Sequence, residues 1–258
     1  MSPAELVGLV SSAAAAGLIN AVAGGGTLLT FPTLLVFGTA PLVANATSTL
    51  ALVIGTFGGV FGYRNQLAAV RPWLWRLLPP SLVGGWLGSW LLKNTSDHVF
   101  AKLVPFLILF ATILFLAQGV IKRWTGKSPA EPTSPAARTV VGAVLFQFGV
   151  AVYGGYFGAG IGILMLASLG LIGLSDIHQM NALKTVLGSL INLVASIVFI
   201  LAGLIDWPRA GIMTVGALVG YLVGSHYSQR IPQARVRQIV TAIGLLIAAV
   251  SFWKEFLR

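Results

Sequence analysis

The sequence predicts an all-α polytopic membrane protein built from two homologous repeats, and three observations carry this prediction. Of the 258 residues, 57% are hydrophobic and only 9% are charged, which is more apolar surface than a soluble core of this length can bury. Apolar runs of about 20 residues match the ~30 Å hydrocarbon core of a bilayer, which favours helices over the strands of a barrel. A glycine-rich motif followed by a polar cluster occurs twice, which indicates an internal duplication.

The two copies of this motif lie 136 residues apart in the sequence, so that Ala23 corresponds to Ala159. The first consists of Ala23 to Leu28 and Asn45 to Thr49, and the second of Ala159 to Leu164 and Asn181 to Thr185. Over the whole stretch from Ala23 to Thr49, the first repeat matches the second at eight identical positions without a gap. Glycines between two apolar runs, with a polar cluster at the start of the next long helix, are typical of secondary transporters that expose backbone at mid-membrane. Close helix crossings are the simpler explanation of the glycines alone.

Each repeat is predicted to contain a glycine-broken pair of short helices and three full transmembrane helices. Residues 1–121 form the first repeat, residues 139–258 form the second, and the Pro-, Ser-, Thr- and Ala-rich segment 122–138 is a flexible cytoplasmic linker. The helices expected in the first repeat are Leu6 to Val22, Leu28 to Phe37, Pro41 to Tyr63, Leu77 to Leu92 and Leu103 to Ile121. Those expected in the second are Val140 to Phe157, Ile163 to Leu174, Ile177 to Gly203, Ala210 to Val223 and Val236 to Phe256.

Local signals support these boundaries. Pro41 suits the first turn of a helix, because its missing N–H would have no partner there. Asp176 followed three residues later by Gln179 is a capping-box pattern. Trp73 and Trp75 lie in a loop with three cations, where an interfacial aromatic belt is expected. That loop, from residue 64 to residue 76, is therefore predicted to be cytoplasmic.

The net charge of +10 is predicted to set membrane topology and not to bind nucleic acid. Most basic residues fall in loops and at helix ends. No Lys or Arg precedes Arg64, which argues against a cleaved signal peptide. Inverted repeats place ten basic residues on one side and five on the other, but parallel repeats give the same count, with Lys184 omitted. Inversion is favoured because the first two segments together are longer than one crossing needs.

A polar stripe runs down one face of the predicted helix 177–203. At 100° per residue, its members share one face of the helix. Lys184 is the charged member, and a cation inside a span is costly and is usually functional. Pairing with Asp176, or snorkelling to lipid headgroups, is the structural alternative. The stripe consists of Asn181, Lys184, Thr185, Gly188, Ser189, Asn192 and Ser196.

A cation without a fixed counter-ion, beside helix N-termini with free N–H groups, indicates an anion site. Polar side chains at the starts of the two long helices are expected to donate to the anion, and the glycines are expected to let backbone approach it. The substrate-binding residues predicted from the first repeat are Gly24, Gly25, Gly26, Asn45, Thr47, Ser48 and Thr49. Those from the second repeat are Gly160, Gly162, Asn181, Lys184, Thr185 and Asn192.

Enzymatic chemistry is not expected. The chain has no cysteine, and its three histidines have no metal-ligand spacing. No phosphate-binding loop, G-x-S-x-G or H-E-x-x-H motif occurs, so no cofactor or metal site is predicted.

The chain resembles the sulfite exporter TauE/SafE family, also called the toluene sulfonate uptake permease family. The resemblance rests on the segments Ala23 to Pro32, Ala44 to Ser48, Tyr153 to Leu166 and Asp176 to Lys184, and on the order of the helices. It implies transport of a small sulfur-containing anion such as sulfite, a sulfonate or sulfoacetate, driven by an ion gradient. The second repeat has Ile161 where the first has Gly25, so a symmetric site is not expected.

The predicted function is secondary transport of a small anion by a multi-pass protein of the bacterial inner membrane. A passive anion channel and a non-transporting membrane scaffold are the alternatives. A proton is the candidate co-transported ion, since an anion arriving beside Lys184 favours the protonated amine and the two would bind together. The exact substrate, the direction of transport and the oligomeric state stay open.

Overall fold

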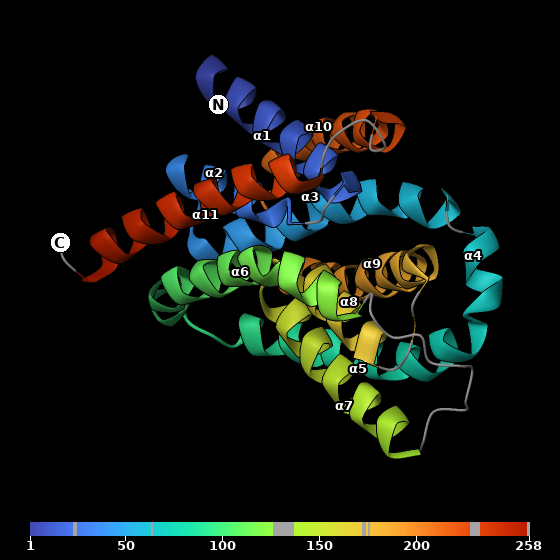
Figure 1. The fold of residues 1–258 in the computed structure, drawn as a ribbon. Coiled ribbons are helices and arrows are strands. Elements are labelled where there is room, and N and C mark those ends of the chain that lie inside the picture. Colours follow the sequence, from blue (N-terminus) through green and yellow to red (C-terminus); the bar gives the residue numbers. More distant parts are fainter. Residues whose placement is uncertain are drawn as a thin grey trace.

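A computed structural model describes residues 1–22, 25–62, 64–125, 137–171, 174, 176–227 and 233–256, and these residues are helical apart from short connections (Figure 1). The predicted all-α class is confirmed for this part of the chain. The helices are α1 (Pro3–Val22), α2 (Thr27–Val36), α3 (Pro41–Gly62), α4 (Arg64–Ala69), α5 (Arg71–Lys93), α6 (Asp97–Thr125), α7 (Ala137–Tyr156), α8 (Ile161–Leu171), α9 (Ile177–Leu201), α10 (Trp207–Tyr227) and α11 (Gln233–Phe256).

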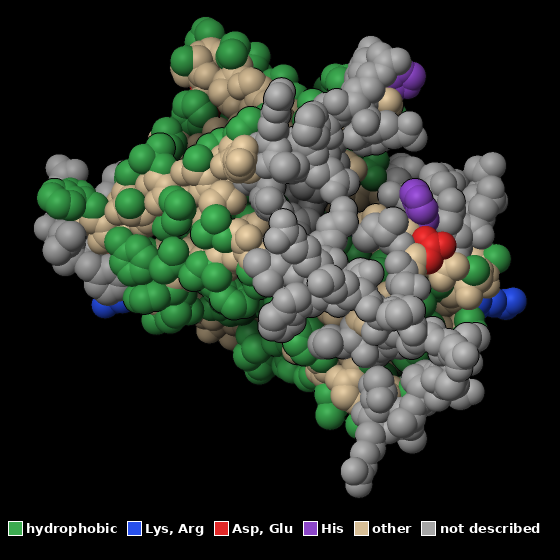
Figure 2. Space-filling view, in the orientation of Figure 1, with side chains coloured by type: hydrophobic (Ala, Val, Ile, Leu, Met, Phe, Trp, Pro, Cys, Tyr) green, Lys and Arg blue, Asp and Glu red, His purple; other side chains and the backbone are tan. Residues whose placement is uncertain are grey.

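Three of the described helices are both long and apolar enough to cross a membrane, over Pro3–Ala21, Asp97–Ala117 and His178–Leu201. By length alone α3, α5, α7, α10 and α11 also suffice, since their 20 to 24 residues span about 30 to 36 Å at 1.5 Å per residue. The surface agrees with a lipid environment. Figure 2 shows mostly hydrophobic side chains on the described part of one face, with Lys and Arg at its edges.

The glycine-broken pairs are unequal. Helices α1 and α7 each have 20 residues, whereas α2 has 10 and α8 has 11. The prediction of two short helices is therefore wrong for the first member of each pair, because each helix begins before its apolar run, at Pro3 or at Ala137. Gly25, Gly158 and Gly160 have φ values of 99°, 82° and 80°. These left-handed conformations, which glycine adopts without steric cost, end the long helix and start the short one.

Two further boundaries differ from the prediction. The expected loop after α3 contains a short helix, α4, and α5 begins already at Arg71. The linker predicted over 122–138 is shortened at both ends, since α6 continues to Thr125 and α7 begins at Ala137. Residues 126–136 lie outside the described part of the chain. The predicted start of α3 at Pro41 and the Asp176 N-cap of α9 are both confirmed.

The helices do not pack by repeat. Helix α10 packs along α1 and α3, whereas α5 packs along α7 and α9. Figure 1 shows α1 and α10 side by side at the top and α5 and α7 together at the bottom. One buried cluster contains only residues of α5, α7, α8, α9 and the turn before α5, and a larger cluster joins α1, α2, α3, α6 and α10 with parts of α9 and α11. The third long helix of each repeat therefore packs against helices of the other repeat: α5 of the first repeat packs on α7 and α9, and α10 of the second repeat packs on α1 and α3. We call this arrangement the exchange of α5 and α10.

Glycines allow this exchange. A Cβ atom on Gly220 of α10 would collide with the carbonyl oxygen of Ala14, and a Cβ on Gly88 of α5 would collide with that of Val152. Neighbouring helices in membranes approach this closely only where the facing residues are small. Gly220 of the second repeat corresponds to Gly84 of the first, which likewise leaves no room for a Cβ between itself and α7. The contact of α10 with α1 and the contact of α5 with α7 therefore depend on glycines at corresponding positions of the two repeats.

Candidate functional site

The first glycine break lies between α1 and α2, and the second lies between α7 and α8. Both breaks contact one face of α6. The Phe115 ring lies directly on Gly25, and a Cβ on Gly160 would be 3.4 Å from Leu114 Cδ1 and 3.8 Å from Ala111 Cα. Residues four apart on a helix have Cβ atoms about 5 to 6 Å from each other, so Ala111 and Phe115 are one turn apart. The break of the first repeat thus lies about one helical turn from the break of the second. Sequence reasoning gave α6 no part in the site.

Lys184 lies against the second break. A Cβ on Gly162 would be 3.1 Å from Cδ and 3.8 Å from Cε of this lysine, so the aliphatic stem crosses the first turn of α8. The Lys184 side chain is half-buried. Both ion pairs found within the described residues belong to Arg209, so Lys184 has no carboxylate partner in this part of the chain.

Asp176 does not pair with Lys184. Its Oδ1 instead accepts hydrogen bonds from the backbone N–H groups of His178 at 2.8 Å and Gln179 at 3.4 Å. These are bonds of a helix N-cap, which satisfy two of the donors left free at the start of α9. The Asp176 alternative for Lys184 is therefore not formed in this structure.

The backbone of the second break supplies an N–H beside Lys184. The N–H groups of Ile161 and Ile163 donate to Gly158 and Gly160 at 3.4 and 3.0 Å. The N–H of Gly162, between them, makes no such bond within the described residues. A helix start carries partial positive charge on such free N–H groups. Lysine and helix start together favour an anion at this place.

At the first break, the N–H that corresponds to that of Gly162 has a partner. The N–H of Gly26, which corresponds to Gly162, donates to Asn20 Oδ1 at 2.8 Å. The position corresponding to Lys184 is Ser48, whose Oγ lies 2.6 Å from Thr30 Oγ1. The Phe115 ring covers Gly25. The two breaks therefore differ in chemistry, and the polar, uncompensated one belongs to the second repeat.

The four polar residues at the start of α3 contact four different groups. Asn45 Nδ2 donates to the carbonyl oxygen of Tyr156 at 3.1 Å, next to the second break. Thr47 accepts from the N–H of Asp206 at 3.0 Å, and the Thr49 hydroxyl donates to the carbonyl of Asn45 at 2.9 Å. Ser48 faces α2, as described above. Thr47 is rotated by about 200° from Asn45 around the helix, so its side chain points away from Asn45, whereas Ser48 is on the side of Asn45 and is bonded to Thr30.

The stripe of α9 faces both the second break and α3. Asn192 Oδ1 lies 3.7 Å from the Cβ position of Gly158. Ser189 donates to Thr56 of α3 at 3.2 Å. Asn181 and Thr185 are half-buried and form no side-chain hydrogen bond with another described residue. The structure thus places Asn192 near Gly158 and Lys184 over Gly162. Gly24 lies outside the described residues.

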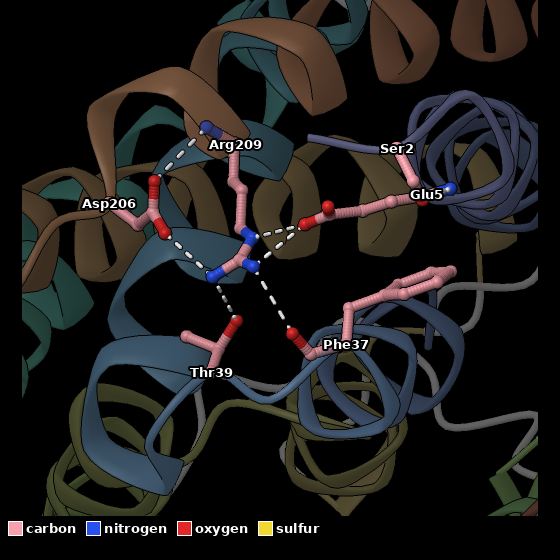
Figure 3. Close-up of polar contacts among 6 residues, drawn as sticks. All are labelled: Ser2, Glu5, Phe37, Thr39, Asp206 and Arg209. Atoms are coloured by element: carbon pink, nitrogen blue, oxygen red, sulfur yellow. Dashed lines mark hydrogen bonds and ion pairs between the residues drawn. The ribbon is translucent and has the colours of Figure 1, made fainter.

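A charged cluster that the sequence did not reveal joins one end of α1 to α10 (Figure 3). Arg209 donates to Glu5 Oε1 at 2.7 and 2.9 Å, to Asp206 Oδ2 at 2.9 Å, and to Thr39 Oγ1 and the Phe37 carbonyl at 3.1 Å. A guanidinium has five N–H donors, and these five bonds use all of them. The cluster therefore fixes the start of α10 to the start of α1 and to the α2–α3 connection.

Comparisons with known proteins agree with a transporter. The profile of the sulfite exporter TauE/SafE family matches residues 9–251. The probable membrane transporter protein of Haemophilus influenzae is 28% identical over 241 residues, covering 93% of this chain and 91% of that protein. The probable membrane transporter protein YfcA of Escherichia coli K12 is 26% identical over 254 residues, covering 96% and 90%. A probable membrane transporter protein, ORF9, of a Sinorhizobium species is 26% identical over 238 residues, covering 90% and 87%. No solved structure matches significantly.

Proposed function

Because the chain belongs to the sulfite exporter TauE/SafE family, we propose that it is a secondary transporter of a small anion across the bacterial inner membrane. The anion is a sulfur-containing oxyanion such as sulfite, a sulfonate or sulfoacetate. The observation that carries this proposal is the Lys184 stem over Gly162, beside a backbone N–H without a carbonyl partner and with no carboxylate paired to the lysine among the described residues. A charged side chain inside a span is costly, and a bound anion would compensate the charge of Lys184.

The anion would bind between the second break and the starts of α3 and α9. Lys184 and the Gly162 N–H are its charged and backbone donors, and Asn192 lies near Gly158, at the other end of the same break. Asn45 joins the first repeat to this place through Tyr156. Thr47 and Ser48, also predicted to bind the anion, contact Asp206 and Thr30 and so hold the start of α3 beside the site. Lys184 is also the group that would carry a co-transported proton.

We further infer that the repeats are inverted. Helices α3 and α9 are corresponding elements of the two repeats. Near the start of α3, Thr47 bonds to Asp206, which follows the end of α9. Towards the other end of α3, Thr56 bonds to Ser189 near the middle of α9. These two contacts support antiparallel α3 and α9, the arrangement that inverted repeats require.

Single cysteines can test the inversion, because the natural chain has none. Ala40→Cys, before α3, and Leu201→Cys, at the end of α9, should react from the same side of the membrane with an impermeant thiol reagent. His178→Cys, at the start of α9, should react only from the other side. All three positions are exposed, so the substitutions should not disturb packing. If Ala40→Cys and His178→Cys label from one side, the repeats are parallel.

Transport itself is tested with purified protein in liposomes. Under an imposed pH or voltage gradient, we expect accumulation of at least one anion from a panel of sulfite, methanesulfonate, sulfoacetate and simple carboxylates. Accumulation above electrochemical equilibrium distinguishes a coupled transporter from a passive anion channel. If no anion of the panel moves, and variants of the α9 stripe alter only complex assembly, the non-transporting scaffold is correct.

A further inference from the structure

Phe115 of α6 fills the space above the first glycine break. Its side chain is fully buried, and its ring atoms occupy the position that a Cβ on Gly25 would need. Gly25 itself has a φ of 99°, so glycine is required there by the backbone and not only by the ring. The sequence predicted that this glycine would let backbone approach the ligand. The structure instead presents an aromatic surface at that place.

This aromatic surface lies close to the anion-binding end of the proposed site. Ala111 and Leu114 of the same helix contact Gly160, two residues before the glycine under Lys184. The second break and the first break thus lie against positions of α6 that are about one helical turn apart. The N–H of Gly26 is already bonded to Asn20, so a ligand that reaches the first break finds the Phe115 ring at Gly25 and no free Gly26 donor.

The arrangement has no equivalent in the other repeat. At the offset that relates the repeats, Phe115 corresponds to Ser251 and Gly25 corresponds to Ile161. A large ring thus sits on a glycine at one break, whereas the corresponding positions at the other carry a small polar residue and a branched side chain. One end of the site is shaped to accept charge, and the other is closed by the ring.

We propose that Phe115 is a specificity-determining residue, which sets the maximum length of the apolar group that a bound anion carries. This inference rests on the proposed anion site at Lys184. The anionic head lies at the second break, and its substituent points at the Phe115 ring. A smaller side chain at position 115 would open the space above Gly25 to a longer substituent.

The test is a binding series with methane-, ethane-, butane- and hexanesulfonate on the full-length protein in detergent or nanodiscs. In the wild type, affinity should fall at the chain length that first reaches the ring. Phe115→Ala and the milder Phe115→Leu should move this limit to longer chains, with a gain of about fourfold per methylene that newly fits. Methanesulfonate binding should change by less than about threefold, because its head contacts Lys184 and not the ring.

Phe106→Ala is the matched control, since it makes the same change on the same helix at a half-exposed ring that packs on Phe252 of α11. It should leave the length profile unchanged. An unchanged profile in both Phe115 variants, while the sulfonates still bind, overturns this inference and leaves the anion site intact. A wild type that binds none of the series, or a series insensitive to Lys184→Ala, overturns the proposed function and the inference with it.

Discussion

Lys184→Ala protein is expected to bind its anion about ten- to a hundredfold more weakly than the wild type. A hydrogen bond between a charged donor and an anion contributes about 1.5 to 3 kcal/mol, which corresponds to that loss of affinity. The fold should tolerate the change. A cation at the centre of a span costs about 2.5 to 3.5 kcal/mol on insertion scales, and Lys184 has no carboxylate partner among the described residues to leave unpaired.

Binding is measured by titration calorimetry on monodisperse protein, and the control is Lys93→Ala. Lys93 is exposed at the end of α5, so its removal changes the net charge equally without touching either glycine break. Lys184→Arg should retain part of the affinity with altered selectivity, because a planar fork replaces a compact ammonium. If Lys184→Ala binds as tightly as the wild type, Lys184 is a snorkelling residue and the anion site lies elsewhere.

Gly162→Ala probes the same site without removing the charge. The added methyl group would lie 3.1 Å from Lys184 Cδ, closer than ordinary contact, so the lysine stem has to shift by a few tenths of an ångström. We expect an affinity loss smaller than that of Lys184→Ala. In the Lys184→Ala background the same substitution should have little further effect, since the neighbour it displaces is gone.

Local sequence signals predicted the elements of this fold well. Apolar length predicted the helices, and glycines between apolar runs predicted the two breaks, three of whose glycines adopt positive φ. Asp176 capped α9 as its spacing indicated, because an N-cap depends only on residues within one turn.

Features that depend on contacts between distant residues were not predictable. Nothing in the sequence near Phe115 indicates that its ring covers Gly25, because the two lie far apart along the chain. Arg209 was counted as a topology signal, but it forms ion pairs with Glu5 across the whole chain and with Asp206 next to it. Thr47 and Ser48 were grouped with Asn45, although Thr47 bonds to Asp206 and Ser48 bonds to Thr30 of α2. The partner of each polar group comes from tertiary packing, which one sequence does not display.

The exchange of α5 and α10 between the repeats could not be predicted from the sequence either. It requires glycine at single positions where two helix backbones touch. Helix α1 runs beside α10 with backbone in contact at Gly220, and α7 runs beside α5 with backbone in contact at Gly88. A side chain can rotate away from an added methyl group, but a backbone carbonyl cannot. Substitution at either glycine therefore has to separate two helices along their length.

Gly220→Ala and Gly88→Ala are expected to destabilise the protein by about 1 to 3 kcal/mol each or more, the usual cost of overpacking a tight contact. The measurement is the thermal unfolding midpoint in detergent, with the fraction of monodisperse protein as a second readout. Gly211→Ala on α10 and Gly149→Ala on α7 are the controls, because no atom lies within 4 Å of the added Cβ at either position. The controls should match or slightly exceed the wild type, since alanine is favoured over glycine within a helix.

The pattern of losses also tests the correspondence of the two crossings. Gly84 corresponds to Gly220, and Gly88 corresponds to Gly224, and each of the four leaves no room for a Cβ against α7 or α1. All four alanine variants should therefore unfold below the two controls. If Gly220→Ala and Gly211→Ala share one unfolding midpoint, α10 does not lie in backbone contact with α1, and the exchange of helices between the repeats is wrong.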